Sequence, residues 1–121
     1  MTLLEDNAAE NSAIEPTFGL SDRALGLLRA LFSAYPTIER AVVYGSRAKG
    51  NYRHGSDIDI ALDAPGMDFD VFMRLCTAAD DLMLPWNIDL SLISHIDNPD
   101  LLEHIARVGK VLWKNLHTLS N

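Results

Sequence analysis

The residues best suited to chemistry lie near the middle of the chain, at Gly45-Ser46 and at Asp57 and Asp59. A glycine that follows a strand lets the backbone turn tightly, and successive backbone N–H groups at such a turn can bind an anion. The Ser46 hydroxyl adds one more hydrogen-bond donor. The pair therefore suits a phosphate, although a Gly-Ser pair by itself is a turn in most sequences.

Asp57 and Asp59 are spaced as two residues on the same face of a strand. Carboxylates at i and i+2 have Cα atoms about 6.5–7 Å apart. They can converge on a hard cation such as magnesium, which prefers oxygen ligands. The alternative is an edge strand whose acids simply face water.

Asp89 could complete this acidic cluster, because it lies in the next β-prone run, Asn87-Ile88-Asp89-Leu90-Ser91-Leu92. Three carboxylates on adjacent strands can hold two divalent ions about 3.5–4 Å apart, the spacing used in in-line phosphoryl chemistry. Taken alone, Asp89 is equally typical of a surface acid at a strand end.

Apolar periodicity, capping residues and prolines predict the elements that must position these side chains. In order, we expect a helix from Ser21 to Pro36, a strand over 40–44, a short helix or structured loop over 47–52, a strand over 57–62, a helix from Asp68 to Pro85, a strand over 87–93, a helix from Asn98 to Gly109 and a short strand over 110–113. This order is typical of an α/β (α+β) domain with a small mixed sheet packed against helices.

The two later helices have predicted buried faces. For the helix that begins at Asp68, these residues are Phe69, Phe72, Met73, Cys76, Ala79 and Met83. For the helix that begins at Asn98, they are Leu101, Leu102, Ile105 and Val108. Cys76 is therefore interpreted as part of the core and not as a nucleophile.

Length and composition limit the possible functions. A chain of 121 residues suits one domain, which we place at residues 18–121 after a flexible tail over 1–17. The net charge of −7 and the pI of about 4.8 argue against direct nucleic-acid binding over a broad face. The single cysteine excludes an internal disulfide, and neither a signal peptide nor a membrane-spanning stretch is seen, so the cytoplasm is the expected location.

The combined motif resembles the signature of the DNA polymerase β-like nucleotidyltransferase superfamily. Its carriers are Gly45-Ser46, ten intervening residues, and Asp57-x-Asp59. The fuller strings Gly45-Ser46-Arg47-Ala48-Lys49-Gly50 and Ser56-Asp57-Ile58-Asp59-Ile60 are similar to those of the minimal branch, the MNT domains. Leu84-Pro85-Trp86-Asn87-Ile88-Asp89-Leu90 resembles the strand that carries the third acid in that branch. The resemblance covers roughly residues 20 to 114.

The resemblance implies a role for each matching position. Gly45 and Ser46 would hold the β- and γ-phosphates of ATP, and Asp57 and Asp59 would bind two magnesium or manganese ions. Asp89 would bind the ion nearer the acceptor and help deprotonate the acceptor hydroxyl. The fold implied is that of the polymerase β palm.

Several other residues are candidates for a role near this motif. Arg47 and Lys49 could neutralise charge on the triphosphate, but a solvated short helix is equally compatible with them. Tyr52 and Trp86 could stack on a base, although packing at a strand start is the better interpretation of Trp86. The four histidines, His54, His95, His104 and His117, lack metal-ligand spacing.

Members of the minimal branch are often antitoxins paired with HEPN-domain toxins, as in the MntA-like, type VII pairs. The resemblance thus implies a nucleotidyltransferase that adenylylates a tyrosine of a partner HEPN toxin. The alternative is a non-catalytic module that neutralises a partner by docking alone. Transfer to a small molecule such as an aminoglycoside is disfavoured, because relatives that do this carry an extra domain. A homodimer or hetero-oligomer could supply the missing wall of the cleft.

Overall fold

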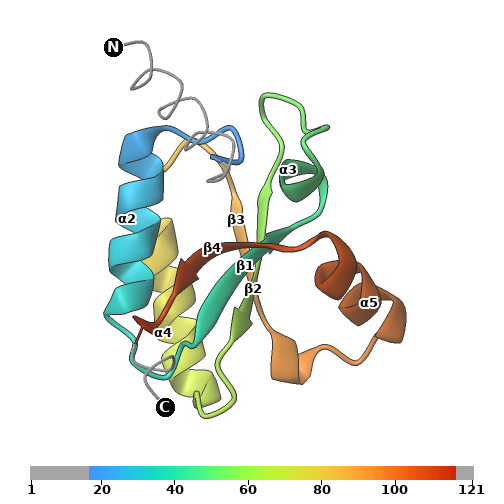
Figure 1. Ribbon diagram of the computed structural model, residues 1–121. Helices are drawn as coiled ribbons and strands as arrows, with labels where there is room; N and C mark the ends of the chain where they lie inside the picture. The colour runs from blue at the N-terminus through green and yellow to red at the C-terminus, as the bar shows by residue number, and fades with distance from the viewer. Residues whose placement is uncertain (1–16, 117–121) are drawn as a thin grey trace, which may run out of the picture.

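The computed structural model describes residues 17–116, so the first 16 residues of the expected tail lie outside the described part. Figure 1 shows a small sheet with helices on both faces. The elements are α2 (Asp22–Ser33), β1 (Arg40–Tyr44), α3 (Ser46–Lys49), β2 (Ile58–Asp63), α4 (Phe69–Asp80), β3 (Ile88–Leu92), a 3-10 helix η1 (Ile93–His95), α5 (Pro99–Val108) and β4 (Lys110–Lys114). All the expected strands and long helices are present, and the short segment after β1 is a helix. No helix within 17–116 is long and apolar enough to cross a membrane.

The four strands form one mixed sheet in the order β3-β2-β1-β4. β1 pairs antiparallel with both β2 and β4, whereas β2 and β3 run parallel. Parallel neighbours need a crossover connection, and α4 supplies it between β2 and β3. The expectation of a small mixed α/β sheet is confirmed.

The two faces of the sheet are covered unequally. α2 and α4 lie together on one face and α5 lies alone on the other (Figure 1). Strand alternation directs Ile58, Ile60 and Leu62 of β2 into the main core under α2 and α4. Asp59 and Ala61 consequently face the α5 side, where Ala61 joins a second, smaller apolar cluster.

Local sequence signals determine where the helices begin. The Ser21 side chain accepts a hydrogen bond from the Ala24 amide at 3.1 Å, which caps α2. Asn98 caps α5 by accepting from the Asp100 amide at 2.9 Å, directly before Pro99 at the first helical position. Both caps lie where the sequence predicts them.

The predicted buried face of α4 is wrong in part. The side chains that are buried are Phe72, Leu75 and Ala79. Phe69, Met73 and Met83 are instead 55%, 50% and 83% exposed, and Cys76 is half-buried. α4 packs on the edge strand β3 and on α2, so only one flank of the helix reaches the core. A helical period shows that an apolar face exists, but it does not show how much of that face the neighbouring elements cover.

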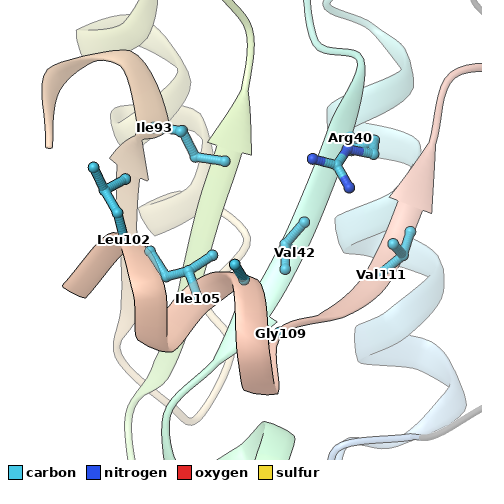
Figure 2. Close-up of a pocket in the computed structure, with 8 residues that line it drawn as sticks. Arg40, Val42, Ile93, Leu102, Ile105, Gly109 and Val111 are labelled. Carbon is cyan, nitrogen blue, oxygen red and sulfur yellow. The ribbon is translucent and has the colours of Figure 1, made fainter. Parts of the chain in front are cut away.

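α5 is also less buried than its sequence predicts. Of its four expected inner residues only Ile105 is fully buried, whereas Leu101, Leu102 and Val108 are half-buried. A pocket of about 250 Å³ remains between α5 and the sheet. Figure 2 shows Leu102 and Ile105 of α5 at this pocket, together with Val42 of β1 and Val111 of β4. The motif acids are not among its lining residues.

Candidate active site

The Gly45-Ser46 turn joins β1 directly to the short helix α3. Gly45 has φ +72° and ψ −154°, a conformation that only glycine adopts readily. A Cβ atom at this position would lie 2.7 Å from Oδ2 of Asp59. Glycine is therefore needed for two reasons, the backbone turn and the close approach of the Asp59 carboxylate. The two halves of the motif meet at this contact.

Asp59 and Asp89 are brought together by the pairing of β2 with β3. They are direct partners in the parallel register, and Tyr44 of β1 is the partner of Asp59 on its other side. Asp57 precedes the first residue of β2 and is exposed, whereas Asp59 is half-buried. The fold thus places acids from two neighbouring strands side by side, with Asp59 at the Gly45 turn.

The electrostatics of Asp59 are unfavourable in the protein alone. Burial raises the pKa of the Asp59 carboxyl, and the nearby carboxylates of Asp89 and Asp57 raise it further. The two salt bridges between residues 17 and 116 are Arg40–Asp63 and Arg107–Glu103, so neither neutralises these acids. A bound cation would relieve this repulsion.

The donor set at this site fits magnesium only in combination with other ligands. Within residues 17–116 no three His, Cys, Asp or Glu side chains already surround one point as a metal site. Magnesium usually takes one or two carboxylates and fills its remaining positions with waters and substrate phosphates. Asp59 and Asp89, with Asp57 next to them, fit that pattern.

Arg47 lies inside the protein and not at the surface of the turn. The residue is 3% exposed, and burial lowers the pKa of its guanidinium. Its nitrogens donate to three backbone carbonyls, those of Phe18 at 2.8 Å, Ser56 at 3.0 Å and His54 at 3.2 Å. These bonds join α3 to the segment before α2 and to the loop that leads to Asp57.

Two aromatic rings complete the surroundings of Arg47. Its guanidinium carbon lies 4.7 Å from the centre of the Tyr52 ring and 5.5 Å from that of Trp86. Tyr52 and Trp86, weighed above as base-stacking candidates, thus flank this arginine. Lys49, by contrast, is exposed at the end of α3. The surroundings favour a structural role for Arg47 and leave Lys49 as the available cation of this pair.

His104 is a site residue that sequence reasoning did not predict, and α5 brings it to the Gly45 turn. The Gly45 amide donates to Nε2 of His104 at 3.3 Å, so this nitrogen carries no proton in that contact. The imidazole also lies edge-on to Tyr44, with ring centres 6.2 Å apart. Burial raises the pKa of Tyr44, Asp59 and Asp89 act in the same direction, and a hydrogen bond with Ser91 opposes them. Because His104 and Gly45 are 59 positions apart in the sequence, only the fold reveals this contact.

Solved structures with this fold include toxin–antitoxin complexes. A toxin–antitoxin complex with AMP-PNP superposes with a TM-score of 0.63 and 22% identity, over 78% of this chain and 76% of the other. An MNT antitoxin in complex with tri-AMPylated HEPN toxin from Shewanella oneidensis gives 0.59 and 18%, over 84% and 78%. A nucleotidyltransferase structure from Sulfolobus solfataricus gives 0.52 and 21%, over 90% and 88%.

Sequence comparison identifies the family. No curated protein sequence gives a significant match. The family model described as "Polymerase beta, Nucleotidyltransferase" matches residues 27–117, which include the Gly45 turn, all three acids and His104. Since this match spans most of the chain, the protein belongs to the polymerase β nucleotidyltransferase family.

Proposed function

We propose that this protein is a magnesium-dependent nucleotidyltransferase that moves AMP from ATP to a tyrosine hydroxyl of a HEPN toxin, and thereby acts as the antitoxin in the cytoplasm. The observation that carries the proposal is the pairing of Asp89 with Asp59, whose carboxylate lies at the Gly45-Ser46 turn. Support for the nucleotide and the acceptor comes from solved relatives of the same fold, one with AMP-PNP and one with a tri-AMPylated HEPN toxin.

The proposed roles follow the placement of each residue. Ser46 and the backbone at the Gly45 turn bind the β- and γ-phosphates, and exposed Lys49 neutralises part of their charge. Asp57, Asp59 and Asp89 would hold the magnesium ions. Bound magnesium supplies charge neutralisation at the triphosphate and makes the acceptor hydroxyl more acidic.

The proposed transfer is a single displacement at the α-phosphorus. The acceptor oxygen forms a bond to this phosphorus while the bond to the oxygen that bridges the α- and β-phosphates breaks. Pyrophosphate leaves, and the proton of the hydroxyl passes to the Asp89 carboxylate and from there to water. The half-buried Asp59 and the Gly45 turn fix the position of the nucleotide, since in-line attack requires a precise orientation.

The direct test is label transfer from α-labelled ATP to the cognate HEPN protein, with and without magnesium. We expect transfer by the wild-type protein and a loss of at least roughly hundredfold in an Asp57→Asn, Asp59→Asn variant, since loss of a residue that merely supports a metal ligand already costs about 10–100-fold. Asp63→Asn is the matched control, because it removes a carboxylate from the same strand and face but away from the Gly45 turn.

Two outcomes would contradict the proposal. One is an absence of label on the HEPN protein with every divalent ion tried. The other is a double variant that still neutralises the toxin at equal dose, which would mean that docking alone suffices. Binding of the HEPN protein must be measured in parallel, so that a lost interaction is not mistaken for lost chemistry.

A further inference from the structure

An apolar stripe runs along the outer flank of α4, and we name it the α4 stripe. It consists of Phe69, Met73 and Cys76 on the helix and Met83 just beyond it. At 100° per residue the three helical positions share one side of α4, about 90° from the buried face. Phe69, Met73 and Met83 account for three of the five large apolar side chains that are exposed between residues 17 and 116. The stripe therefore gathers most of the exposed large apolar side chains of the described structure on one flank of α4.

The α4 stripe lies beside the open edge of the sheet. Phe69 stacks on His95, directly after β3, with ring centres 6.1 Å apart. At the other end, Met83 lines a small surface pocket with Asn87 and Ile88, at the start of β3. β3 is the edge strand of the sheet. The stripe consequently follows β3 along its length and ends close to Asp89.

This placement leaves one side of Asp89 open to an acceptor. β2 occupies one side of Asp89, where Asp59 is its direct partner, and the opposite side of β3 is free of strands in the described structure. Leu90 and Leu92 face the core under α4, so Asp89 lies on the other face of β3. A macromolecule that reaches Asp89 around this open edge lies against β3 and can contact the α4 stripe at the same time. The stripe and the proposed transfer site thus border the same edge strand.

The negative charge around the α4 stripe indicates which kind of partner can bind to it. Asp80 lies in line with the stripe, and the exposed Asp70 and Asp81 border it on the solvent side. Burial raises the pKa of the Cys76 thiol, with further contributions from Asp80 and Asp89, which places both acids near the stripe. A second copy of this chain, with net charge −7, would be repelled. Residues 1–16 contain four acidic residues and no lysine or arginine, so they are disfavoured for the same reason.

We propose that the α4 stripe and the adjoining edge of β3 form the docking surface for the acceptor protein, through a partner face of apolar side chains bordered by lysine and arginine. This inference rests on the proposed function for the identity of the acceptor. Apolar contact provides the affinity, whereas the acidic border speeds association with a basic partner and rejects acidic ones. The hydroxyl to be modified is thereby delivered to the Asp89 side of the site.

The test uses the full chain and the cognate HEPN protein, with binding measured by calorimetry and transfer by label from ATP. Met73→Lys should weaken binding roughly tenfold or more and reduce transfer in parallel. Val111→Lys is the matched control, because Val111 is a similarly exposed apolar residue on β4, the opposite edge strand. Asp70→Lys should slow association mainly at low salt, whereas Asp100→Lys, in the first turn of α5, should not. ATP binding should be unchanged in all four variants.

The outcomes separate docking from catalysis. Equal binding by the Met73→Lys, Val111→Lys and wild-type proteins would overturn the docking surface and leave the proposed transfer intact. Failure of the wild-type protein to bind the HEPN protein would also overturn it. A third outcome is possible, in which the wild-type protein binds the HEPN protein but transfers no label, and Met73→Lys is the only variant that loses binding. This result would support the docking surface and refute the nucleotidyl transfer.

Discussion

Replacement of Arg47 by methionine should destabilise the whole domain and not only the nucleotide site. Methionine keeps much of the side-chain volume but removes every donor. A hydrogen bond from a charged group contributes about 1.5–3 kcal/mol when buried, and less where water can replace it. The bond to Phe18 is buried and those to His54 and Ser56 are partly buried, so the expected loss is about 4 kcal/mol in total.

This loss would be a large share of the free energy of unfolding, which is about 5–15 kcal/mol for most domains. For a domain of this size it corresponds to a fall in Tm of about 15–25 °C. Arg47→Lys should cost about half as much, because an ammonium keeps the charge but cannot reach three carbonyls at once. Urea denaturation followed by Trp86 fluorescence in a Trp113→Phe background would measure both changes.

Lys49→Met is the control for Arg47, because this exposed neighbour should change the free energy of unfolding by less than about 0.5 kcal/mol. The opposite pattern would refute the structural interpretation. If Arg47→Met left stability within about 1 kcal/mol of wild type and instead weakened ATP binding, the guanidinium would be a ligand of the triphosphate, as the sequence motif predicts.

Two further predictions concern the site itself. His104→Leu should raise KM for ATP about tenfold with little change in kcat, because it removes the acceptor for the Gly45 amide. In His104→Gln the side-chain amide oxygen can take the place of Nε2, so this variant should keep most of the wild-type affinity for ATP. Equal defects in the two variants would contradict this role of His104. The raised pKa of Asp59 means that the metal-free folded protein holds the proton of this carboxyl more tightly than the unfolded chain does. Protonation of Asp59 therefore favours the folded state at low pH. This contribution to stability is lost as pH rises through the folded-state pKa. Asp59→Asn should therefore raise the Tm of the metal-free protein at neutral pH, with the gain shrinking as pH falls, and abolish the stabilisation by magnesium; an Asn variant that melts lower than wild type at pH 7 would contradict this sign.

Local signals in the sequence predicted the secondary structure well. Ser21 and Asn98 cap their helices because a side-chain oxygen satisfies free backbone amides, which requires only neighbouring residues. The alternation around Asp59 likewise predicts which face of β2 is polar. Each of these predictions depends on a few consecutive residues, and the structure confirms them.

Tertiary features could not be predicted in the same way. The motif placed Arg47 among the nucleotide-binding residues, but its partners Phe18 and Trp86 are 29 and 39 positions away and meet it only after folding. His104 reaches Gly45 for the same reason. The exposure of Met73 depends on how much of α4 is covered by its neighbours, β3 and α2. The spacing of apolar residues along α4 does not carry that information. The number of neighbours around a side chain is a property of the assembled layers.

The parallel register of β3 with β2 has a consequence for the folding of the chain. Leu90 and Leu92 contact the main core from one face of β3, while Asp89 lies on the other, so a slip of one residue would turn the acid inward and the leucines outward. Burial of the leucines therefore selects the register that pairs Asp89 with Asp59. Since β3 is far along the chain from β1, a partly synthesised or partly folded molecule has the Gly45 turn and Asp59 but lacks the acid that faces the acceptor. The ability to modify another protein should thus arise together with the completed core, and not before it.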